Sequence, residues 1–167
     1  MKKILIIGCG HMGGALLKSW LNSNKYLITV VDPFKYKLLK KKYINKHVTI
    51  YKNINFLKKD SNVKFNFIIF ATKPLDLNKA TSEISSYNID KKTKIVSVVA
   101  GKKIKSLEKI FKNLNNIFRV MPNMPASIGQ SMNCIVSKSI VDSKDINQVV
   151  KLFSYSGKTI ILKNENE

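Results

Sequence analysis

Short apolar runs recur along the chain, and most of them end at glycine or proline. Residues 4–7 are Ile-Leu-Ile-Ile and run into Gly8, while residues 27–31 end at Asp32 and Pro33. Apolar runs of about four to eight residues with such boundaries are typical of strands buried on both faces. We therefore predict strands at both places. The same pattern predicts further strands at 48–51, 65–71, 94–99, 117–121, 134–136 and 159–162.

Between these runs, apolar residues recur at the spacing of an amphipathic helix. Met12, Ala15, Leu16 and Trp20 share one helical face. The same period predicts helices at 34–45, 75–87, 104–114 and 146–153, and another that opens at Asn53. Strands that alternate with helices indicate a doubly wound, mostly parallel sheet with helices on both faces, which is an α/β fold.

The first predicted strand ends in a Gly-x-Gly-x-x-Gly sequence that opens the first predicted helix. This sequence consists of Gly8, Cys9, Gly10, His11, Met12 and Gly13. In such a turn, Gly8 permits the sharp bend, Gly10 lets the backbone approach a pyrophosphate, and Gly13 lets the helix pack closely on the strand. The helix N-terminus offers unpaired N–H groups to the phosphates. These residues predict a dinucleotide site in a Rossmann-type sheet.

An acidic residue follows at the place where such sites hold the ribose. Asp32 lies about 20 positions after the glycine turn, at the end of the second predicted strand. Its carboxylate can accept hydrogen bonds from the ribose hydroxyls of NADH, whereas it would repel the 2′-phosphate of NADPH. Lys35 and Lys37 follow it and attract the more highly charged cofactor. We therefore expect NADP or NAD as the cofactor, with Asp32 in contact with it unless Pro33 turns the side chain out of the pocket.

Composition bounds the class of protein. The chain has 167 residues, of which 44% are hydrophobic and 24% charged, and this suits one domain, 1–167, with a real core. No apolar run approaches the roughly 18 residues of a membrane span or the roughly 7–15 of a signal-peptide core. Cys9 and Cys134 form neither a disulfide framework nor a metal-binding spacing. We expect a cytoplasmic protein without a membrane or metal partner.

The net charge of +20 suggests nucleic acid at first sight, but its composition argues against that partner. All but one of the positive residues are lysines, the exception being Arg119, whereas nucleic-acid surfaces favour the bidentate arginine fork. The lysines are spread along the chain, and no recognition motif accompanies them. Abundant Asn and Ile point to codon bias in an AT-rich genome, so we expect no nucleic-acid partner.

Several segments, in chain order, resemble pyrroline-5-carboxylate reductase, the enzyme of the last step of proline synthesis. Residues 119–125 with Gly129 are the most specific, because they are similar to that family's R-x-M-P-N-x-P-x-x-x-G, and the only arginine falls on its Arg. The other matching segments are 8–15 (G-x-G-x-M-G-x-A), 71–74 (A-V-K-P), 97–101 (S-x-x-A-G) and 152–157 (L-F-x-x-x-G), with Glu165 or Glu167 near the acid that follows. Thr72 and Met124 replace the usual Val and Thr, and Gln130-Ser131 stands where a second Gly is common.

The resemblance implies a role for each segment. The glycine turn would hold the pyrophosphate, Asn53 the adenosine ribose, and Lys73 a cofactor hydroxyl. Further residues implied at the cofactor are Ala71, Thr72, Pro74, Val98, Val99 and Ala100. Those on the substrate side are Met121, Pro122 and Asn123, of which Asn123 is equally well explained as a structural turn residue. The implied reaction is the NAD(P)H-dependent reduction of 1-pyrroline-5-carboxylate, a small imino acid, to L-proline.

The resemblance covers only part of that family's chain. The family continues into a helical dimerisation and substrate domain with an S-G-S-G-P-A-Y-like stretch, which is missing here. We therefore expect the parent enzyme to be a homo-oligomer, and residues 1–167 to be a monomeric cofactor domain, inactive on its own.

The side chains offer no hydrolytic machinery. His11 lies inside the phosphate turn, His47 has no nucleophile at a recognisable motif, and the carboxylates form no spaced pair. We assign no catalytic residue, because a cyclic iminium already carries its proton and needs mainly orientation against the nicotinamide. The alternatives are the cofactor domain of another NAD(P)-dependent dehydrogenase, of the 3-hydroxyacid or prephenate type, and a non-catalytic nucleotide-binding domain.

Overall fold

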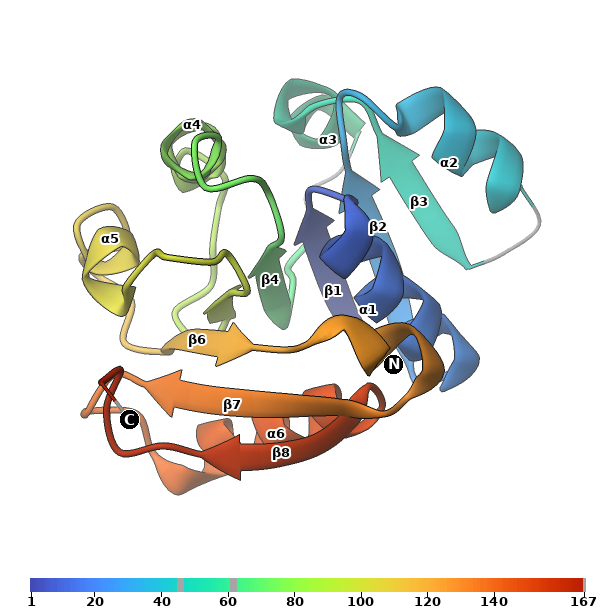
Figure 1. Ribbon diagram of the computed structural model, residues 1–167. Coiled ribbons are helices and arrows are strands. Elements are labelled where there is room, and N and C mark those ends of the chain that lie inside the picture. The colour runs from blue at the N-terminus through green and yellow to red at the C-terminus, as the bar shows by residue number, and fades with distance from the viewer. Residues whose placement is uncertain (45–46, 61–62, 167) are drawn as a thin grey trace.

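A computed structural model describes residues 1–44, 47–60 and 63–166, and it forms an eight-stranded sheet between two layers of helices (Figure 1). The strands are β1 (Lys2–Ile7), β2 (Tyr26–Val31), β3 (Val48–Tyr51), β4 (Phe67–Phe70), β5 (Lys94–Ser97), β6 (Ile117–Met121), β7 (Ser131–Ser137) and β8 (Gly157–Ile161). The helices are α1 (His11–Asn22), α2 (Tyr36–Lys42), α3 (Ile54–Asp60), α4 (Leu77–Ser85), α5 (Ile104–Glu108) and α6 (Ser143–Ser154), with a short 3-10 helix, η1 (Met124–Ile128).

The strand order places the first strand in the middle of the sheet. Along the sheet the order is β3-β2-β1-β4-β5-β6-β7-β8, and β1 to β6 are all parallel. The chain therefore builds outward from β1 to β3, then crosses back and builds from β4 in the opposite direction. The carboxyl ends of β1 and β4 lie side by side at this switch point, which is where open α/β sheets bind their ligands.

Alternate residues of the central strands feed two hydrophobic cores. Ile4 and Ile6 face the core covered by α1, α2 and α6, whereas Leu5 and Ile7 face the core covered by α3, α4 and α5. Trp20 joins α1 to α6, because its indole N–H donates to the Leu152 carbonyl at 2.9 Å and its ring packs edge-on against Phe153. The predicted doubly wound, mostly parallel α/β fold is confirmed.

The last part of the sheet differs from the rest. β7 runs antiparallel to β6, and β8 runs parallel to β7 with α6 between them in the chain (Figure 1). Reversal follows from η1, which ends at Gly129 with φ of +74°, a conformation that glycine adopts without strain. The short strand expected at 134–136 is the centre of a longer one, because buried Ser131 and Asn133 interrupt the apolar pattern.

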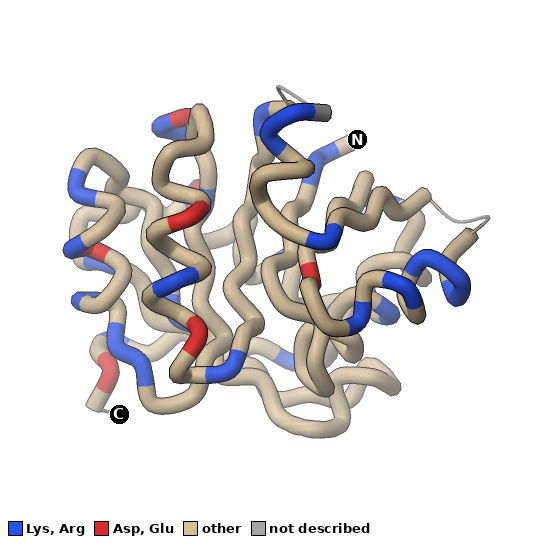
Figure 2. Tube along the Cα trace, turned by 90° about the horizontal axis from the view of Figure 1, so that it is seen from above, with Lys and Arg blue, Asp and Glu red and all other residues tan. Residues whose placement is uncertain are grey.

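Some helices are shorter than their periodicity predicted, whereas α6 is longer than the predicted 146–153. The helix expected at 34–45 is observed only from Tyr36 to Lys42, and residue 45 lies outside the described residues. The helix expected at 104–114 stops at Glu108 and continues as turns. Lysines appear on helices around the whole sheet and do not gather into one stripe (Figure 2).

Candidate functional site

The glycine turn after β1 is packed against the end of β4. A Cβ on Gly8 would lie 2.8 Å from the Ala71 carbonyl oxygen, and Gly8 has φ of +91°. A Cβ on Gly13 would lie 2.3 Å from the Gly8 carbonyl oxygen and 3.1 Å from the Ala71 Cβ. Both glycines are therefore required by close backbone contacts, as the sequence motif predicted for the bend and for the helix packing.

Gly10 differs from these two glycines, because no described neighbour lies within 4 Å of where its Cβ would be. Open space therefore borders the backbone at the start of α1. No side-chain hydrogen bond from the described residues caps this helix, and its first turn carries no acid. His11 is exposed and Met12 half-buried beside it. Uncapped N–H groups next to open space form a cradle that fits an anionic phosphate.

Asp32 lies at the end of β2 but faces inward, with only 6% of its surface exposed. Its Oδ2 accepts a hydrogen bond from the Cys9 N–H at 2.7 Å. Its Oδ1 accepts from the N–H groups of Phe34 at 2.9 Å and Lys35 at 2.7 Å. The carboxylate thus ties the glycine turn to the loop between β2 and α2.

Cys9 is shielded in the middle of the turn. Its side chain is 2% exposed, and burial, followed by the nearby Asp32 carboxylate, raises the pKa of the thiol to about 11. The thiol is therefore neutral at physiological pH, and Cys9 contributes packing and a backbone N–H to the turn.

Asn53 begins α3 beyond the end of β3. Its Oδ1 accepts a hydrogen bond from the Phe56 N–H at 3.1 Å, so the side chain caps the helix. Capping accounts for an asparagine at this position without a ligand, and it also holds the residue half-exposed near the β2 end of the site.

The ends of β4 and β5 present backbone more than side chains. Val98 and Val99 are buried in the two opposite cores, and only Ala100 is exposed. At the end of β4, Lys73 and Pro74 are exposed. The predicted residues of these strand ends therefore do meet at one edge of the sheet, with the valines supplying shape through the main chain.

Thr72 carries an unsatisfied group at this edge. Its Oγ1 is buried, yet it has no hydrogen-bond partner among the residues that the structure describes. The Thr72 Cα lies 2.9 Å from the ideal Cβ position of Gly8, so the side chain sits beside the tightest contact of the turn.

The segment after β6 reaches back to the first helix. Met121 and Asn123 are exposed and Pro122 is half-buried, and the η1 helix that follows packs against α1 (Figure 1). The Asn123 Oδ1 accepts from the Met132 N–H at 3.0 Å, which fastens the β6–β7 connection. This side chain therefore has the structural function that the sequence left open for it.

Two exposed apolar side chains near the site were not singled out from the sequence. Phe34, in the loop after β2, is 90% exposed, and Leu75, in the loop after β4, is 93% exposed. The sequence predicts a helix from Phe34 onward, and helical periodicity alone does not indicate this exposure. The signal available was its position directly after Asp32-Pro33, since a proline there favours a turn.

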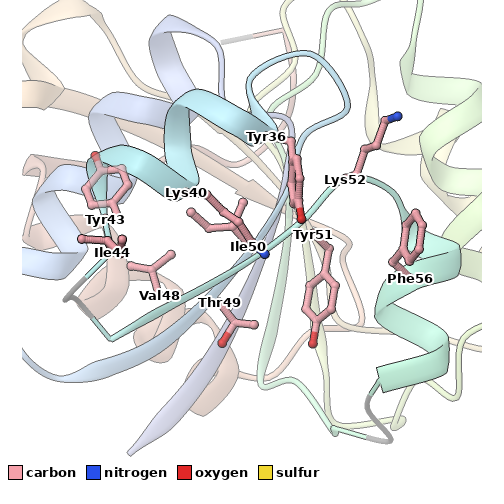
Figure 3. A pocket seen from close by; sticks show the side chains of 10 residues that line it. All are labelled: Tyr36, Lys40, Tyr43, Ile44, Val48, Thr49, Ile50, Tyr51, Lys52 and Phe56. Atoms are coloured by element: carbon pink, nitrogen blue, oxygen red, sulfur yellow. The ribbon is translucent and has the colours of Figure 1, made fainter.

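A separate pocket of about 600 Å³ lies outside the edge strand β3, between α2 and α3 (Figure 3). Tyr36 reaches from α2 toward β3, Phe56 lines the α3 side, and Lys52 points away from the strand. The Lys40 ammonium lies 5.1 Å from the centre of the Tyr36 ring, a cation–π distance. No residue of the glycine turn lines this pocket, and β2 lies between β3 and β1 in the sheet.

Arg119, the only arginine, is paired with the C-terminal segment. Its NH1 group donates to the Glu165 Oε1 at 3.2 Å, and both side chains are 15% exposed. The same oxygen accepts the Ile104 N–H at 3.0 Å. Glu165 is one of the two acids expected after the 152–157 segment, and the other, Glu167, lies outside the described residues.

Comparison with known proteins gives this geometry a family. Residues 3–101 match the family described as NADP oxidoreductase, coenzyme F420-dependent. The chain belongs to this family. The matched residues include the glycine turn, Asp32 and the ends of β4 and β5, and the family match supports NAD(P) as the cofactor.

Individual relatives agree with the resemblance noted from the sequence. Pyrroline-5-carboxylate reductase of Escherichia coli strain K12 is 28% identical over 96% of this chain, which spans 59% of that protein. The crystal structure of Plasmodium falciparum pyrroline carboxylate reductase with NADP bound aligns over 99% of the chain with a TM-score of 0.79 and 24% identity. Prephenate dehydrogenase of Aquifex aeolicus aligns with a TM-score of 0.78 at 16% identity.

These likenesses confirm the fold and the resemblance to pyrroline-5-carboxylate reductases. The chain belongs to an NADP oxidoreductase family, and it spans about 59% of the length of the E. coli relative. The shared fold does not separate reductases from prephenate dehydrogenases. Within the described ranges, no helix is long and apolar enough to cross a bilayer.

Proposed function

We propose that this chain is the cofactor-binding domain of a reductase that converts 1-pyrroline-5-carboxylate to L-proline with NAD(P)H. The observation that carries the proposal is the open cradle at Gly10, at the start of α1, together with the packing of η1, which directly follows Met121-Pro122-Asn123, against this helix. Sequence similarity to E. coli pyrroline-5-carboxylate reductase over nearly the whole chain supports this substrate over a hydroxy acid.

The residues present fit a dinucleotide at this edge of the sheet. Gly10 and the first N–H groups of α1 would hold the pyrophosphate, and Asn53 would lie on the adenosine side. The carboxyl ends of β4 and β5, with Lys73 exposed between them, would bound the nicotinamide side. When bound, the reduced nicotinamide supplies the hydride for a C=N bond.

The protein's own contribution to such a reaction is orientation. An iminium substrate carries its proton already, so no acid is needed at the reacting carbon. Met121 and Pro122 would shape the substrate side and limit access of water. The remaining contacts to the imino acid, and the subunit contacts of the whole enzyme, belong to sequence beyond the span of this chain in its relatives.

A pair of matched glycine substitutions tests the cofactor site. Gly10→Ala places a methyl group in open space, and Gly14→Ala places one 4.0 Å from the Cys9 sulfur, so both variants can fold. We expect calorimetry to show NADPH binding by residues 1–167, weakened about tenfold or more by Gly10→Ala because the pyrophosphate needs close backbone approach. Gly14→Ala should bind as the parent chain does, and equal binding by all three proteins would contradict the site.

The reaction itself is tested by completing the chain. Residues 1–167 alone should oxidise no NADPH in the presence of 1-pyrroline-5-carboxylate. A chimera that continues into the remaining part of the E. coli relative should do so, and the same chimera with Gly10→Ala should not. A chimera that folds and binds NADPH but reduces only a different substrate would refute the proposed reaction while leaving the cofactor site intact.

A further inference from the structure

Asp32 is a carboxylate whose hydrogen-bonding capacity is largely used inside the protein. It accepts from three backbone N–H groups at 2.7–2.9 Å and is 94% buried, since 6% of it is exposed. The donors come from two separate loops: Cys9 belongs to the glycine turn, and Phe34 and Lys35 belong to the loop after β2. A single side chain thus fixes the distance between the phosphate and ribose ends of the cofactor site.

Reading a ribose would demand a different arrangement. An acid that selects NADH presents its oxygens to the two ribose hydroxyls and repels a 2′-phosphate. For Asp32 to do so, its side chain would have to give up buried backbone partners, and each N–H left unpaired costs about 1–3 kcal/mol. Charge-assisted hydrogen bonds of this kind are also roughly twice as strong as neutral ones.

We propose that Asp32 is a positioning residue, which holds the glycine turn against the β2–α2 loop and does not select between NADH and NADPH. This inference rests on the proposed cofactor site. It replaces the expectation, drawn from the position of Asp32 alone, that the carboxylate contacts the ribose.

The selection between NADH and NADPH then depends on the exposed side chains of this loop. Lys35 and Lys37 are both exposed, and with the carboxylate turned inward no acidic side chain of the described loop stands between them and the ribose end. A 2′-phosphate adds nearly two negative charges near these ammonium groups. The loop therefore favours NADPH, in spite of carrying an acid at the position typical of NADH-dependent enzymes.

Substitution of Asp32 separates the two roles. Asp32→Ser keeps an acceptor that can cap the loop at Lys35 but is too short to reach Cys9, and Asp32→Asn keeps the shape with one acceptor fewer. By calorimetry on residues 1–167, both variants should weaken NADPH and NADH by a similar factor of about ten, so that the ratio of the two affinities changes less than about twofold. Ribose reading predicts instead that the ratio moves about tenfold toward NADPH.

The backbone gives a readout that loss of stability alone would not produce. In Asp32→Ser, amide hydrogen exchange should accelerate at Cys9 and remain slow at Lys35, because only the first partner is lost. Asp142→Ser is the matched control: Asp142 caps α6 by accepting the Asp145 N–H at 2.8 Å, far from the glycine turn. It should leave both cofactor affinities and the exchange of Cys9 unchanged.

Substitution of the two loop lysines is the second test of this inference. Lys35→Ala combined with Lys37→Ala should weaken NADPH about tenfold and NADH less than about twofold, whereas Lys91→Ala with Lys92→Ala, exposed at the opposite end of β5, should alter neither. A tenfold change of the affinity ratio in Asp32→Ser with Cys9 exchange unchanged would overturn the inference alone. Failure of the unsubstituted chain to bind either cofactor would overturn the proposed function together with it.

Discussion

Single side chains around the glycine turn hold the main chain in place. Asp32, Asn53 and Asn123 are each predicted from the sequence to lie at the cofactor or the substrate, and each accepts a hydrogen bond from a backbone N–H. Their substitution therefore changes the shape of the site as well as any direct contact. Measurements of affinity for such variants need a structural readout beside them.

We expect the substitution of Thr72 by valine to stabilise the fold. Its buried Oγ1 lacks a partner in the described part of the chain, so Thr72→Val removes an unsatisfied group while keeping the shape. We expect the free energy of unfolding to rise by about 1 kcal/mol, and Tm by about 2–4 °C. NADPH affinity should change little, because the resemblance pairs Thr72 with a valine.

A second threonine is the control for this measurement. Thr81 is fully buried in α4, and its Oγ1 donates to the Leu77 carbonyl at 2.9 Å. Thr81→Val should therefore lower the free energy of unfolding by about 1 kcal/mol. If denaturant titration shows both valine variants losing stability equally, the Thr72 hydroxyl has a partner after all.

The raised pKa of Cys9 predicts that its thiol is labelled slowly and that its contribution to stability depends on pH. With its pKa raised to about 11, roughly a thousandth of the thiol is ionised at pH 8. In Cys134→Ala, labelling of native Cys9 by a disulfide reagent should be at least about a hundredfold slower than in the denatured chain. Folding favours the neutral thiol, so its contribution to stability is full below pH 9 and is lost as the pH rises toward 11.

The reciprocal variant completes the experiment. In Cys9→Ala, the half-buried Cys134 should label faster than Cys9 does in the other protein. Native Cys9 that reacts within seconds at pH 8 would show that the glycine turn opens readily, contrary to its packing.

Sequence could identify the residues of the turn but not the direction in which each faces. The spacing of Gly8, Gly10 and Gly13 was sufficient because backbone geometry alone determines why glycine is needed. The orientation of Asp32 was not predictable, since its donors Cys9 and Lys35 are brought together only by the packing of β1 beside β2. Val98 and Val99, in contrast, face opposite cores because successive side chains of an extended segment alternate between the two faces of the sheet.

Among the elements, the contact between β6 and the C-terminal segment can be tested directly by substitution. Glu165 accepts from both Arg119 of β6 and the Ile104 N–H at the start of α5. Glu165→Ala should lower the free energy of unfolding by about 3 kcal/mol, because it leaves a mostly buried guanidinium without its anion. Glu165→Gln keeps the acceptor for Ile104 and should cost less, about 1 kcal/mol.

A double-mutant cycle isolates the ion pair. Arg119→Met should partly restore the stability of Glu165→Ala, giving a coupling energy of about 1–2 kcal/mol by urea denaturation. Strictly additive losses would mean that the ion pair does not stabilise the segment, and that Glu165 acts only through Ile104.

Strands were predictable from the sequence to within a few residues, and helices less so. The four apolar residues before Gly8 were predicted correctly as part of β1. A continuous apolar run this short, ended by glycine, fits a strand buried on both faces better than a helix. The segment 104–114 stopped early because its apolar residues serve turns as well as a helix, with Phe111 and Leu114 buried after α5 ends. The antiparallel direction of β7 depends on the geometry of η1, which no hydrophobic pattern signals.

On the scale of the molecule, a row of partly exposed apolar side chains across β6, β7 and β8 favours self-association, whereas the large net charge opposes it. Met121, Cys134 and Ile160 are cross-strand neighbours on one face of β6, β7 and β8, and Ile160 is 47% exposed. The net charge of +20 opposes association of this face with a second copy. Charge and apolar surface therefore act in opposite directions on the assembly of residues 1–167.

The dependence of self-association on salt should show whether charge repulsion or apolar contact dominates. We expect light scattering to show a monomer at about 50 mM salt and increasing association toward 1 M, where charge repulsion is screened within about 3 Å. Ile160→Lys should abolish the association, while Leu38→Lys, at an exposed position on α2, should not. A tight dimer at low salt, or association indifferent to Ile160→Lys, would contradict this account.

The central place of β1 in the sheet has a consequence for the growing chain on the ribosome. β1 is made first, but its second neighbour, β4, begins at Phe67, about 60 residues after Ile7. At synthesis rates of about 5–20 residues per second, one edge of this very apolar strand waits roughly 3–12 s for its partner. During that interval β1 is open to pairing with another nascent chain. Lys2 and Lys3, at its start, are the charges that oppose such pairing before the fold exists to protect it.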